Sequence, residues 1–363
     1  MNLKKVAIIG SAGIPAKYGG FETLAENITK YLGEEFLISV YCSGSFFGKN
    51  KIKNHNNSRL IYIPIKANGI QSIIYDIISI IDAVFIKKNS IILVLGTSGS
   101  LVIPLIKIFS NVKVITNIDG LEHKRAKWNY FAKWILKWFE KFSVKFSDEI
   151  ISDNIIIKEY VKKEYLKDSN FIAYGGDHAQ IISMDKETKG TYNLPDKYAF
   201  SVCRIEPENH IELILKSFIN FKEFPIVFIG NWNSSKYGKN LKIKYSKNDN
   251  IILIDAIYDN FILNQLRSNC YVYIHGHSAG GTNPSLVEAM CSCLPILAYN
   301  VSYNKETTFN KAIYFSSKEE LENNLCNLEE KKIKILKSEM YNIGLNYYKW
   351  KLIAEEYSIL LKR

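Results

Sequence analysis

The sequence predicts an α/β protein made of two doubly wound, Rossmann-like domains, each with a parallel sheet covered by helices. Short, continuous apolar segments alternate with longer amphipathic segments along the whole 363-residue chain. This pattern is typical of buried parallel strands joined by helices. The alternation restarts near Asp196, after a polar segment over 183–194 that we interpret as a linker. We therefore expect two domains facing a central cleft at the carboxyl ends of both sheets.

The individual elements follow from the period of the apolar residues. In the first half, strands are expected over 5–10, 36–42, 59–64, 90–95, 112–116, 147–152 and 170–173, and helices over 21–32, 70–85, 101–109 and about 126–146. In the second half, strands are expected over 197–203, 225–230, 250–256, 270–274, 295–299 and 312–315, and helices over 211–221, 259–268 and 283–293. About forty final residues also look helical. We expect one domain over 1–180, a second over 181–345 and a closing helix over 346–363.

The net charge of +11 is compatible with nucleic acid, anionic lipid or a phosphorylated substrate as partner, or with nothing more than solvated lysines. No nucleic-acid-binding motif is present, so we expect no nucleic-acid partner. No apolar run is long enough to span a bilayer, and the chain starts in a strand without a signal-peptide pattern, which favours the cytoplasm. The six cysteines lack metal-site spacing, and we expect no bound metal.

The stretch from His275 to Met290 is the most informative motif. A buried strand leads into a Gly/Ser-rich loop containing Gly280 and Gly281, and then into a helix with Asn283 as N-cap and Pro284 at its first position. Such a loop and helix end bind anions through free backbone N–H groups. Glu288 lies one turn into the helix, where its carboxylate could accept hydrogen bonds from sugar hydroxyls. Phosphate beside hydroxyls suggests a nucleotide sugar.

Other polar groups are expected near the same cleft. The loop over 10–22, with Tyr18, Gly19, Gly20 and Glu22, follows the first strand and opens a helix, so it could hold a phosphate or an acceptor sugar. It matches neither a dinucleotide fingerprint nor a P-loop, and it could be an ordinary surface loop. Other positions have both a functional and a structural interpretation. Arg204 could grip a diphosphate, or it could form an ion pair with Glu206 or Glu208, and Asp119 could be a polar contact or base, or the cap of a turn. The segment 174–177 could be only a turn, and His275 and His277 could form hydrogen bonds to substrate or to backbone.

The expected helix over 128–145 carries lysines every four residues, at 133, 137, 141 and 145, and aromatic residues over much of its remaining surface. It could lie on an anionic membrane, or it could pack into a core with a solvated lysine stripe. We favour the membrane, because the aromatic surface is wider than one packing face needs.

Taken together, these residues resemble a known family. The segments 204–209 and 280–290 resemble the donor half of GT-B retaining glycosyltransferases of the family-4 type. The segments 13–23, 119–122, 152–154, 174–177 and 275–278 are similar to a bacterial rhamnosyltransferase subgroup that acts in capsule, O-antigen and cell-wall polysaccharide assembly. The resemblance covers nearly the whole chain and implies the GT-B fold, with the C-terminal helix crossing back onto the first domain.

The resemblance also implies roles. Arg204 would hold the donor pyrophosphate, Glu288 the ribose, and the loop of Gly280, Gly281, Thr282 and Asn283, with His275 and His277 nearby, the phosphate and donor sugar. Gly19 and Gly20 would lie near diphosphate and acceptor, and Asp119 would replace a histidine near the sugar. Two further positions depart from the family pattern, because Gly280 stands where a glutamate is usual and Asn209 where a lysine is usual. A 6-deoxy sugar, which has one hydroxyl fewer, is compatible with the missing glutamate.

The expected activity is therefore retaining, metal-independent transfer of a hexose. The leading hypothesis is L-rhamnose transfer from dTDP-L-rhamnose to a lipid-linked or growing glycan, by a cytoplasmic protein peripheral on the inner face of the bacterial membrane. The membrane contact would be made by the helix over 124–145. Transfer of another hexose from a UDP- or GDP-sugar, a nucleotide-sugar epimerase and a non-catalytic nucleotide-sugar-binding module remain the alternatives.

Overall fold

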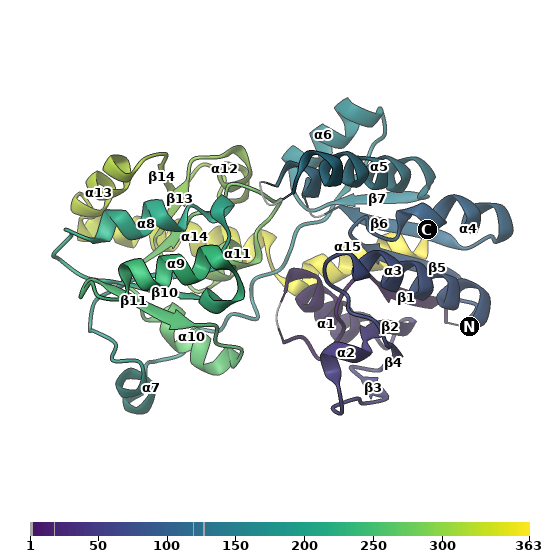
Figure 1. Cartoon of the computed structure of the whole chain (residues 1–363), viewed down its shortest axis with the longest axis horizontal. Helices are drawn as coiled ribbons and strands as arrows, with labels where there is room; N and C mark the ends of the chain where they lie inside the picture. The colour runs from purple at the N-terminus through teal and green to yellow at the C-terminus, as the bar shows by residue number, and fades with distance from the viewer. Residues whose placement is uncertain (1–2, 18, 119, 126–127) are drawn as a thin grey trace. The chain divides into compact units, whose positions relative to one another are not determined.

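The computed structural model describes residues 3–17, 19–118, 120–125 and 128–363, and the chain divides into two compact units. Unit 1 is Met1–Ala173 with Lys351–Arg363, and unit 2 is Tyr174–Trp350 (Figure 1). Each unit has a parallel sheet with helices packed on it, which confirms two Rossmann-like α/β domains. The chain passes between the units after Ala173 and after Trp350, whereas the sequence places these boundaries after residues 180 and 345.

The sheet of unit 1 has the strand order β3-β4-β2-β1-β5-β6-β7-β8, and every neighbouring pair is parallel except β3–β4. The central strands β1, β5 and β6 are buried apart from the lysines that begin β1 and β6, as their apolar sequences predict. The strands are β1 (Lys5–Ile9), β2 (Leu37–Ser43), β3 (Asn54–His55), β4 (Ser58–Ile63), β5 (Ile91–Leu95), β6 (Lys113–Ile118), β7 (Glu149–Ser152) and β8 (Asn170–Phe171).

The helices of unit 1 are α1 (Gly20–Leu32), α2 (Gly44–Phe47), α3 (Gln71–Ile81), α4 (Ile103–Phe109), α5 (Tyr130–Phe146), α6 (Ile155–Tyr165) and, apart from its first residue, α15 (Trp350–Lys362). The predicted helix over 70–85 is α-helical only to Ile81 and continues as a π-helix over Asp82–Ile86. Helix α5 begins at Tyr130 because the Asn129 side chain accepts a hydrogen bond from the Ala132 N–H (2.9 Å) and caps it. Helix α6 was not predicted.

The C-terminal residues of α15 pack within unit 1. Tyr357 accepts a hydrogen bond from the Asn117 side chain at the end of β6 (2.8 Å), and Ser358 donates one to Glu35 after α1 (2.8 Å). The C-terminal helix therefore returns to the N-terminal domain, as the fold predicts.

The sheet of unit 2 has the order β11-β10-β9-β12-β13-β14 and is entirely parallel. Its strands are β9 (Ala199–Val202), β10 (Ile226–Gly230), β11 (Ile251–Asp255), β12 (Val272–His275), β13 (Ile296–Tyr299) and β14 (Ile313–Phe315). Its helices are α7 (Lys186–Thr191), α8 (Ile211–Phe218), α9 (Lys236–Tyr245), α10 (Asn260–Ser268), α11 (Pro284–Cys291), α12 (Ser302–Thr307), α13 (Lys318–Cys326) and α14 (Glu330–Tyr347).

Several elements of unit 2 differ from the prediction, among them α7, α9 and α11. The polar segment over 183–194 is not a plain linker, because Asp185 caps α7 by accepting a hydrogen bond from Thr188 N–H (2.6 Å). Helix α9 was missed. Helix α11 ends at Cys291 rather than at residue 293, since Cys293 has a positive φ of 58° that no longer continues the helix.

Both sheets have a point where the strand order reverses. It lies between β1 and β5 in unit 1, and between β9 and β12 in unit 2. In doubly wound sheets, ligands bind at the carboxyl ends of the strands at such a point, because the loops there diverge to opposite faces and leave a crevice. The loops after β1 and β5, and those after β9 and β12, are therefore the places where a site is expected.

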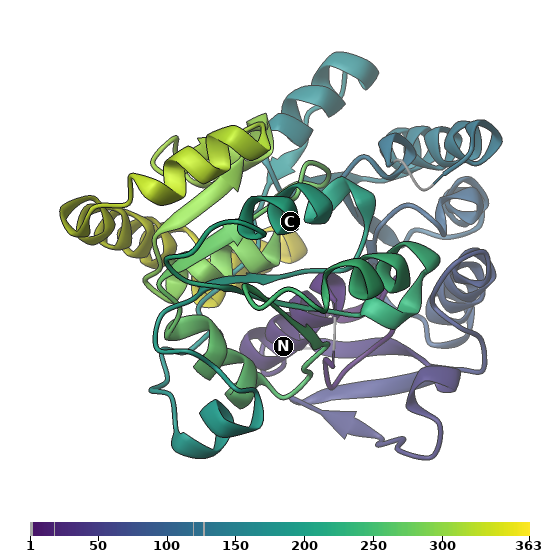
Figure 2. The ribbon, with the colours of Figure 1, turned by 60° about the vertical axis from the view of Figure 1, so that its left-hand side comes forward.

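Helices α3, α4 and α5 lie side by side along one face of unit 1, as the blue and teal helices on the right of Figure 2 show. The outer side of α5 is aromatic. Phe131 is 68% exposed and Trp134 is 54% exposed, and Trp138 is also exposed. The hypothesis that α5 is simply packed into a core is therefore wrong for this side of the helix. No helix among the described residues has the length and apolar character that crossing a bilayer requires.

Candidate functional site

The two loops at the reversal point of unit 2 are joined to each other. Both the N–H and the hydroxyl of Ser278, in the loop after β12, donate to the carbonyl of Glu208, in the loop after β9 (3.0 and 2.8 Å). Gly276 allows this approach, because a Cβ at that position would lie 2.2 Å from the Asn209 carbonyl oxygen. The loop that carries Arg204 and the glycine-rich loop are thus hydrogen-bonded to each other at the carboxyl end of the sheet.

The glycine-rich loop ends at the N-terminus of α11. Asn283 occupies the N-cap position, but its side chain makes no capping hydrogen bond, contrary to the role predicted for it. Pro284 has no N–H, and the Leu286 N–H already donates to the Asn283 carbonyl (3.0 Å). The Ser285 N–H, which the Asn283 side chain does not cap, and the positive end of the helix dipole are therefore the features of α11 suited to an anion. Gly280 has a φ of +118°, a backbone conformation that favours glycine over the glutamate that the family resemblance implies at this position.

Glu288 lies one turn into α11 and is the centre of a buried network within unit 2. Its Oε2 accepts a hydrogen bond from the Arg267 guanidinium (2.5 Å), and its Oε1 lies 3.1 Å from Nε2 of His178. Arg267, only 3% exposed, also donates to the Asn264 side chain (2.8 Å), and the Trp350 indole N–H donates to Nδ1 of His178 (2.9 Å).

Sequence reasoning missed Arg267, His178 and Trp350 as parts of the site. Arg267 is an ordinary-looking basic residue in the last turn of α10, and His178 follows a segment that could be only a turn. The one available signal was the position of Glu288 on a largely apolar helix, because a buried carboxylate requires a charged or hydrogen-bonding partner somewhere in the fold.

The network keeps Glu288 ionised. Burial alone would raise the pKa of the Glu288 carboxyl, but the Arg267 guanidinium and the hydrogen bond from His178 outweigh burial and hold the pKa below its usual value. A carboxylate retains lone pairs beyond those two contacts, so Glu288 can still accept hydrogen bonds from hydroxyl groups.

In the part of the chain that the structure describes, His275 does not make the backbone hydrogen bond that was one of its two predicted roles. His275, at the end of β12, is 1% exposed and stacks on His277 with a centroid separation of 4.4 Å. Among the described residues, neither ring nitrogen of His275 has a hydrogen-bond partner. Burial lowers the pKa of His275 to about 3, so it is neutral near pH 7. The loop is anchored next to it, because Asn304 donates to the His277 carbonyl (2.9 Å).

Arg204 is exposed, and among the ion pairs of the described residues none joins it to Glu206 or Glu208. Its backbone carbonyl accepts a hydrogen bond from the Asn209 side chain (2.7 Å). Asn209, at the position where the family resemblance implies a lysine, therefore supports the turn that presents Arg204 instead of adding a second charge.

In unit 1, the loop after β1 has the glycine-dependent backbone that its sequence predicts. Gly19 has a φ of +117° and precedes α1. Glu22 accepts a hydrogen bond from the Ala12 N–H (2.6 Å), so it holds the loop closed against the start of α1. Tyr18 and Asp119, which were also predicted as site residues, lie outside the described residues.

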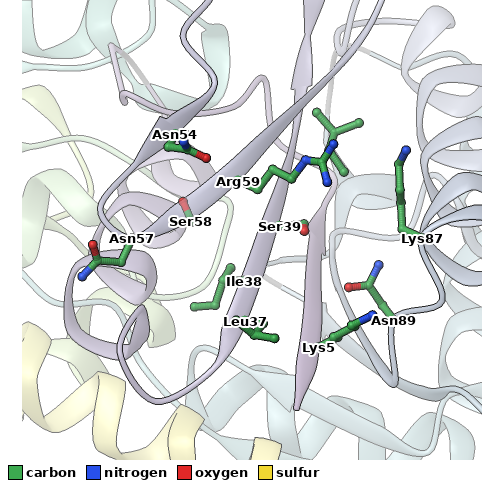
Figure 3. Close-up of a pocket in the computed structure, with 11 residues that line it drawn as sticks. Lys5, Leu37, Ile38, Ser39, Asn54, Asn57, Ser58, Arg59, Lys87 and Asn89 are labelled. Atoms are coloured by element: carbon green, nitrogen blue, oxygen red, sulfur yellow. The ribbon is translucent and has the colours of Figure 1, made fainter. Parts of the chain in front are cut away.

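A separate hollow of about 550 Å³ lies elsewhere on unit 1, among the residues shown in Figure 3. Lys5 at the start of β1 and Leu37 at the start of β2 line it, together with Arg59 on β4. Because it lies toward the amino ends of β1 and β2, it is distinct from the loops where a doubly wound sheet binds ligands. Across the described ranges, we find no group of three His, Cys, Asp or Glu side chains suited to a metal ion.

Two families match the chain. Residues 3–177 match a domain of unknown function (DUF1972), and residues 185–341 match the glycosyl transferases group 1. No curated protein matches.

The fold is similar to solved structures over its whole length. Sucrose-phosphate synthase from Thermosynechococcus elongatus has a TM-score of 0.83 and 14% identity, with 99% of this chain and 98% of that chain covered. HepE of Anabaena, in complex with UDP, has a TM-score of 0.76 and 12% identity, with 99% and 100% covered. A glycosyltransferase from Rickettsia africae has a TM-score of 0.76 and 14% identity, with 100% and 98% covered. The chain thus has the GT-B fold, and residues 185–341 of its C-terminal unit match the group 1 glycosyltransferases.

Proposed function

We propose that this chain transfers a sugar from a nucleotide-sugar donor with retention of anomeric configuration, and that the donor is dTDP-L-rhamnose. The observation that carries the donor site is the arrangement in unit 2, where the N-terminus of α11 lies one helical turn from the ionised Glu288. An anion-binding helix end beside a hydroxyl-binding carboxylate matches the diphosphate and ribose of a nucleotide sugar. HepE, which shares the fold, was solved with UDP.

In this proposal, catalysis rests on the leaving group. The Arg204 guanidinium and the positive N-terminal end of α11 would stabilise the negative charge that develops on the departing diphosphate, so no metal ion would be needed. The incoming hydroxyl would pass its proton to the diphosphate on the same face of the sugar, which accounts for retention. Positioning the acceptor would supply most of the remaining rate enhancement.

The preference for a 6-deoxy sugar rests on Gly280. A glutamate at this position would add a hydrogen-bond acceptor for a sugar hydroxyl, and the positive φ of Gly280 disfavours any side chain there. Rhamnose has no 6-hydroxyl, so it loses no contact. The acceptor, a lipid-linked or growing glycan of a bacterial surface polysaccharide, would approach the loop of unit 1 that contains Gly19 and Gly20.

A lipid-linked acceptor requires the protein to work at a membrane, and α5 is suited to that task. The rings of Phe131, Trp134, Trp138 and Phe142 follow one another with centroid separations of 6.3, 5.8 and 5.9 Å. Lys141 and Lys145 are exposed near the C-terminal end of the helix. Aromatic rings at headgroup depth with lysines beside them fit the anionic inner face of a bacterial membrane.

A donor screen tests the proposal. Purified protein is incubated with dTDP-L-rhamnose, UDP-glucose or GDP-mannose, with and without a bacterial lipid extract, and nucleoside diphosphate release is measured. Proton NMR of the product gives the anomeric configuration. We expect release that depends on the extract and is fastest with dTDP-L-rhamnose.

The other outcomes separate the alternatives. Equal turnover of UDP-glucose and dTDP-L-rhamnose would contradict the donor assignment. Donor conversion without an acceptor would indicate an epimerase. Binding without turnover against any lipid acceptor would indicate a non-catalytic binding module.

A further inference from the structure

The segment Tyr174–His178 and the residues Tyr348–Trp350 are bonded to each other within unit 2. The Gly176 N–H donates to the Tyr348 carbonyl (2.7 Å), and the Trp350 N–H donates to the Asp177 carboxylate (2.8 Å). We call these two segments the clasp. They are the first and the last residues of unit 2, so the clasp joins the two points at which the chain passes between the units.

Two glycines bring the clasp into contact with its surroundings. A Cβ at Gly175 would lie 2.5 Å from the Trp350 ring, and a Cβ at Gly176 would lie 2.4 Å from the carbonyl oxygen of Val287. The segment that could have been only a turn is thus packed directly on α11, next to Glu288, and against the indole of Trp350.

The hydrogen bonds from the clasp to Glu288 have a fixed direction. An indole N–H can only donate, so Nδ1 of His178 must accept from Trp350 (2.9 Å). The imidazole proton is then on Nε2, which donates to Oε1 of Glu288 (3.1 Å). The opposite tautomer would place two N–H groups against each other at Trp350 and two lone pairs against each other at Glu288.

From this geometry, and resting on the proposed function of Glu288, we infer that His178 is a positioning residue for the nucleotide. It orients the Glu288 carboxylate toward the ribose, and Trp350 selects the tautomer that allows it to do so. Arg267 holds the other carboxylate oxygen, so the orientation of Glu288 is fixed from two sides. Nucleotide binding at Glu288 is thereby linked through two hydrogen bonds to the last residue of unit 2.

The decisive variant is Trp350→Phe, which keeps an aromatic ring against Gly175 but removes the N–H. We expect the Kd of the full-length protein for thymidine diphosphate and for uridine diphosphate, measured by calorimetry, to rise about tenfold, which is the upper end of the effect of losing one hydrogen bond between neutral groups. The donor KM should rise with it, while kcat changes by less than about twofold, because uniform binding is lost.

Trp232→Phe is the matched control. Trp232 is buried in the same unit, and its indole N–H donates to the Ile254 carbonyl at the same distance of 2.9 Å, away from Glu288. It should bind nucleotide like the wild type. At His178 itself, His178→Gln keeps a donor near the position of Nε2 and should lose less affinity than His178→Ala.

The tautomer gives a readout that does not depend on binding. Nitrogen-15 NMR of the wild-type imidazole should show His178 protonated on Nε2, and Trp350→Phe should abolish that preference. Protonation on Nδ1 in the wild type, or wild-type affinity of Trp350→Phe, would overturn the inference and leave the proposed function standing. Failure of the wild-type protein to bind either diphosphate would overturn both.

Discussion

Replacing Arg267 by methionine tests how strongly unit 2 depends on the charge that supports Glu288. Arg267 is 3% exposed, its guanidinium lies 2.5 Å from Oε2 of Glu288, and burial itself opposes ionisation of this carboxyl. Removing one partner of a buried ion pair leaves the other charge without compensation, which costs about 3–5 kcal/mol. We expect Arg267→Met to lower the free energy of unfolding of unit 2 by that amount at pH 7.

The pH dependence carries a definite sign. The folded-state pKa of Glu288 is depressed, so its stabilising contribution is present above the unfolded-state value of about 4.5 and is lost as the pH falls below it. In Arg267→Met the carboxyl is expected to protonate at a higher pH. The difference in stability between variant and wild type should therefore be largest at pH 7 and shrink toward pH 4.

Urea denaturation followed by tryptophan fluorescence measures this effect. The double variant Arg267→Met/Glu288→Gln removes both charges and keeps an acceptor for His178, so it should recover most of the lost stability. A loss below about 1 kcal/mol for Arg267→Met at pH 7, or a loss that does not change between pH 7 and pH 4, would refute the reasoning.

Three further predictions concern catalysis, the membrane and the clasp. Arg204→Ala should lower kcat/KM about 10²–10³-fold with an unchanged melting temperature, since Arg204 is exposed and stabilises only the leaving group; steady-state kinetics within twofold of wild type would contradict this. Trp134→Ser/Trp138→Ser should reduce sedimentation with anionic phosphatidylglycerol vesicles severalfold, and undiminished sedimentation would exclude α5 as the contact. Gly176→Ala should destabilise the protein by about 1–3 kcal/mol in thermal denaturation, because the new Cβ would meet the α11 backbone. In the control Gly190→Ala the new Cβ would have no atom within 4 Å, so this variant should be as stable as the wild type. Equal effects of the two substitutions would argue against the clasp packing.

The fold could be predicted from the sequence because its strands are short, apolar and regularly spaced. In β1, for example, the four residues after Lys5 are buried on both faces of the sheet, and a continuous apolar run of this kind predicts such a strand. Helix α9 was missed because its sequence is rich in lysine and contains Gly238. That glycine is needed for packing, since a Cβ there would lie 2.4 Å from the Trp232 carbonyl oxygen.

The candidate site could be predicted only where one local segment carries it. The loop and helix over 275–290 are contiguous in the sequence, so their anion-binding geometry was visible from it. The supports of Glu288 come from three separate segments, at His178, Arg267 and Trp350, and no local pattern links them. The details of capping were also invisible, because Asn283 has the residue type of an N-cap but its side chain does not act as one.

The central claim is that a nucleoside diphosphate binds in unit 2, at the N-terminus of α11. A crystal structure of the protein with thymidine diphosphate tests this claim most directly. We predict diphosphate oxygens on the Ser285 N–H at the start of α11 and on the Arg204 guanidinium, with the ribose hydroxyls on Glu288. A nucleotide bound elsewhere, with Arg204 and Glu288 both untouched, would contradict the account.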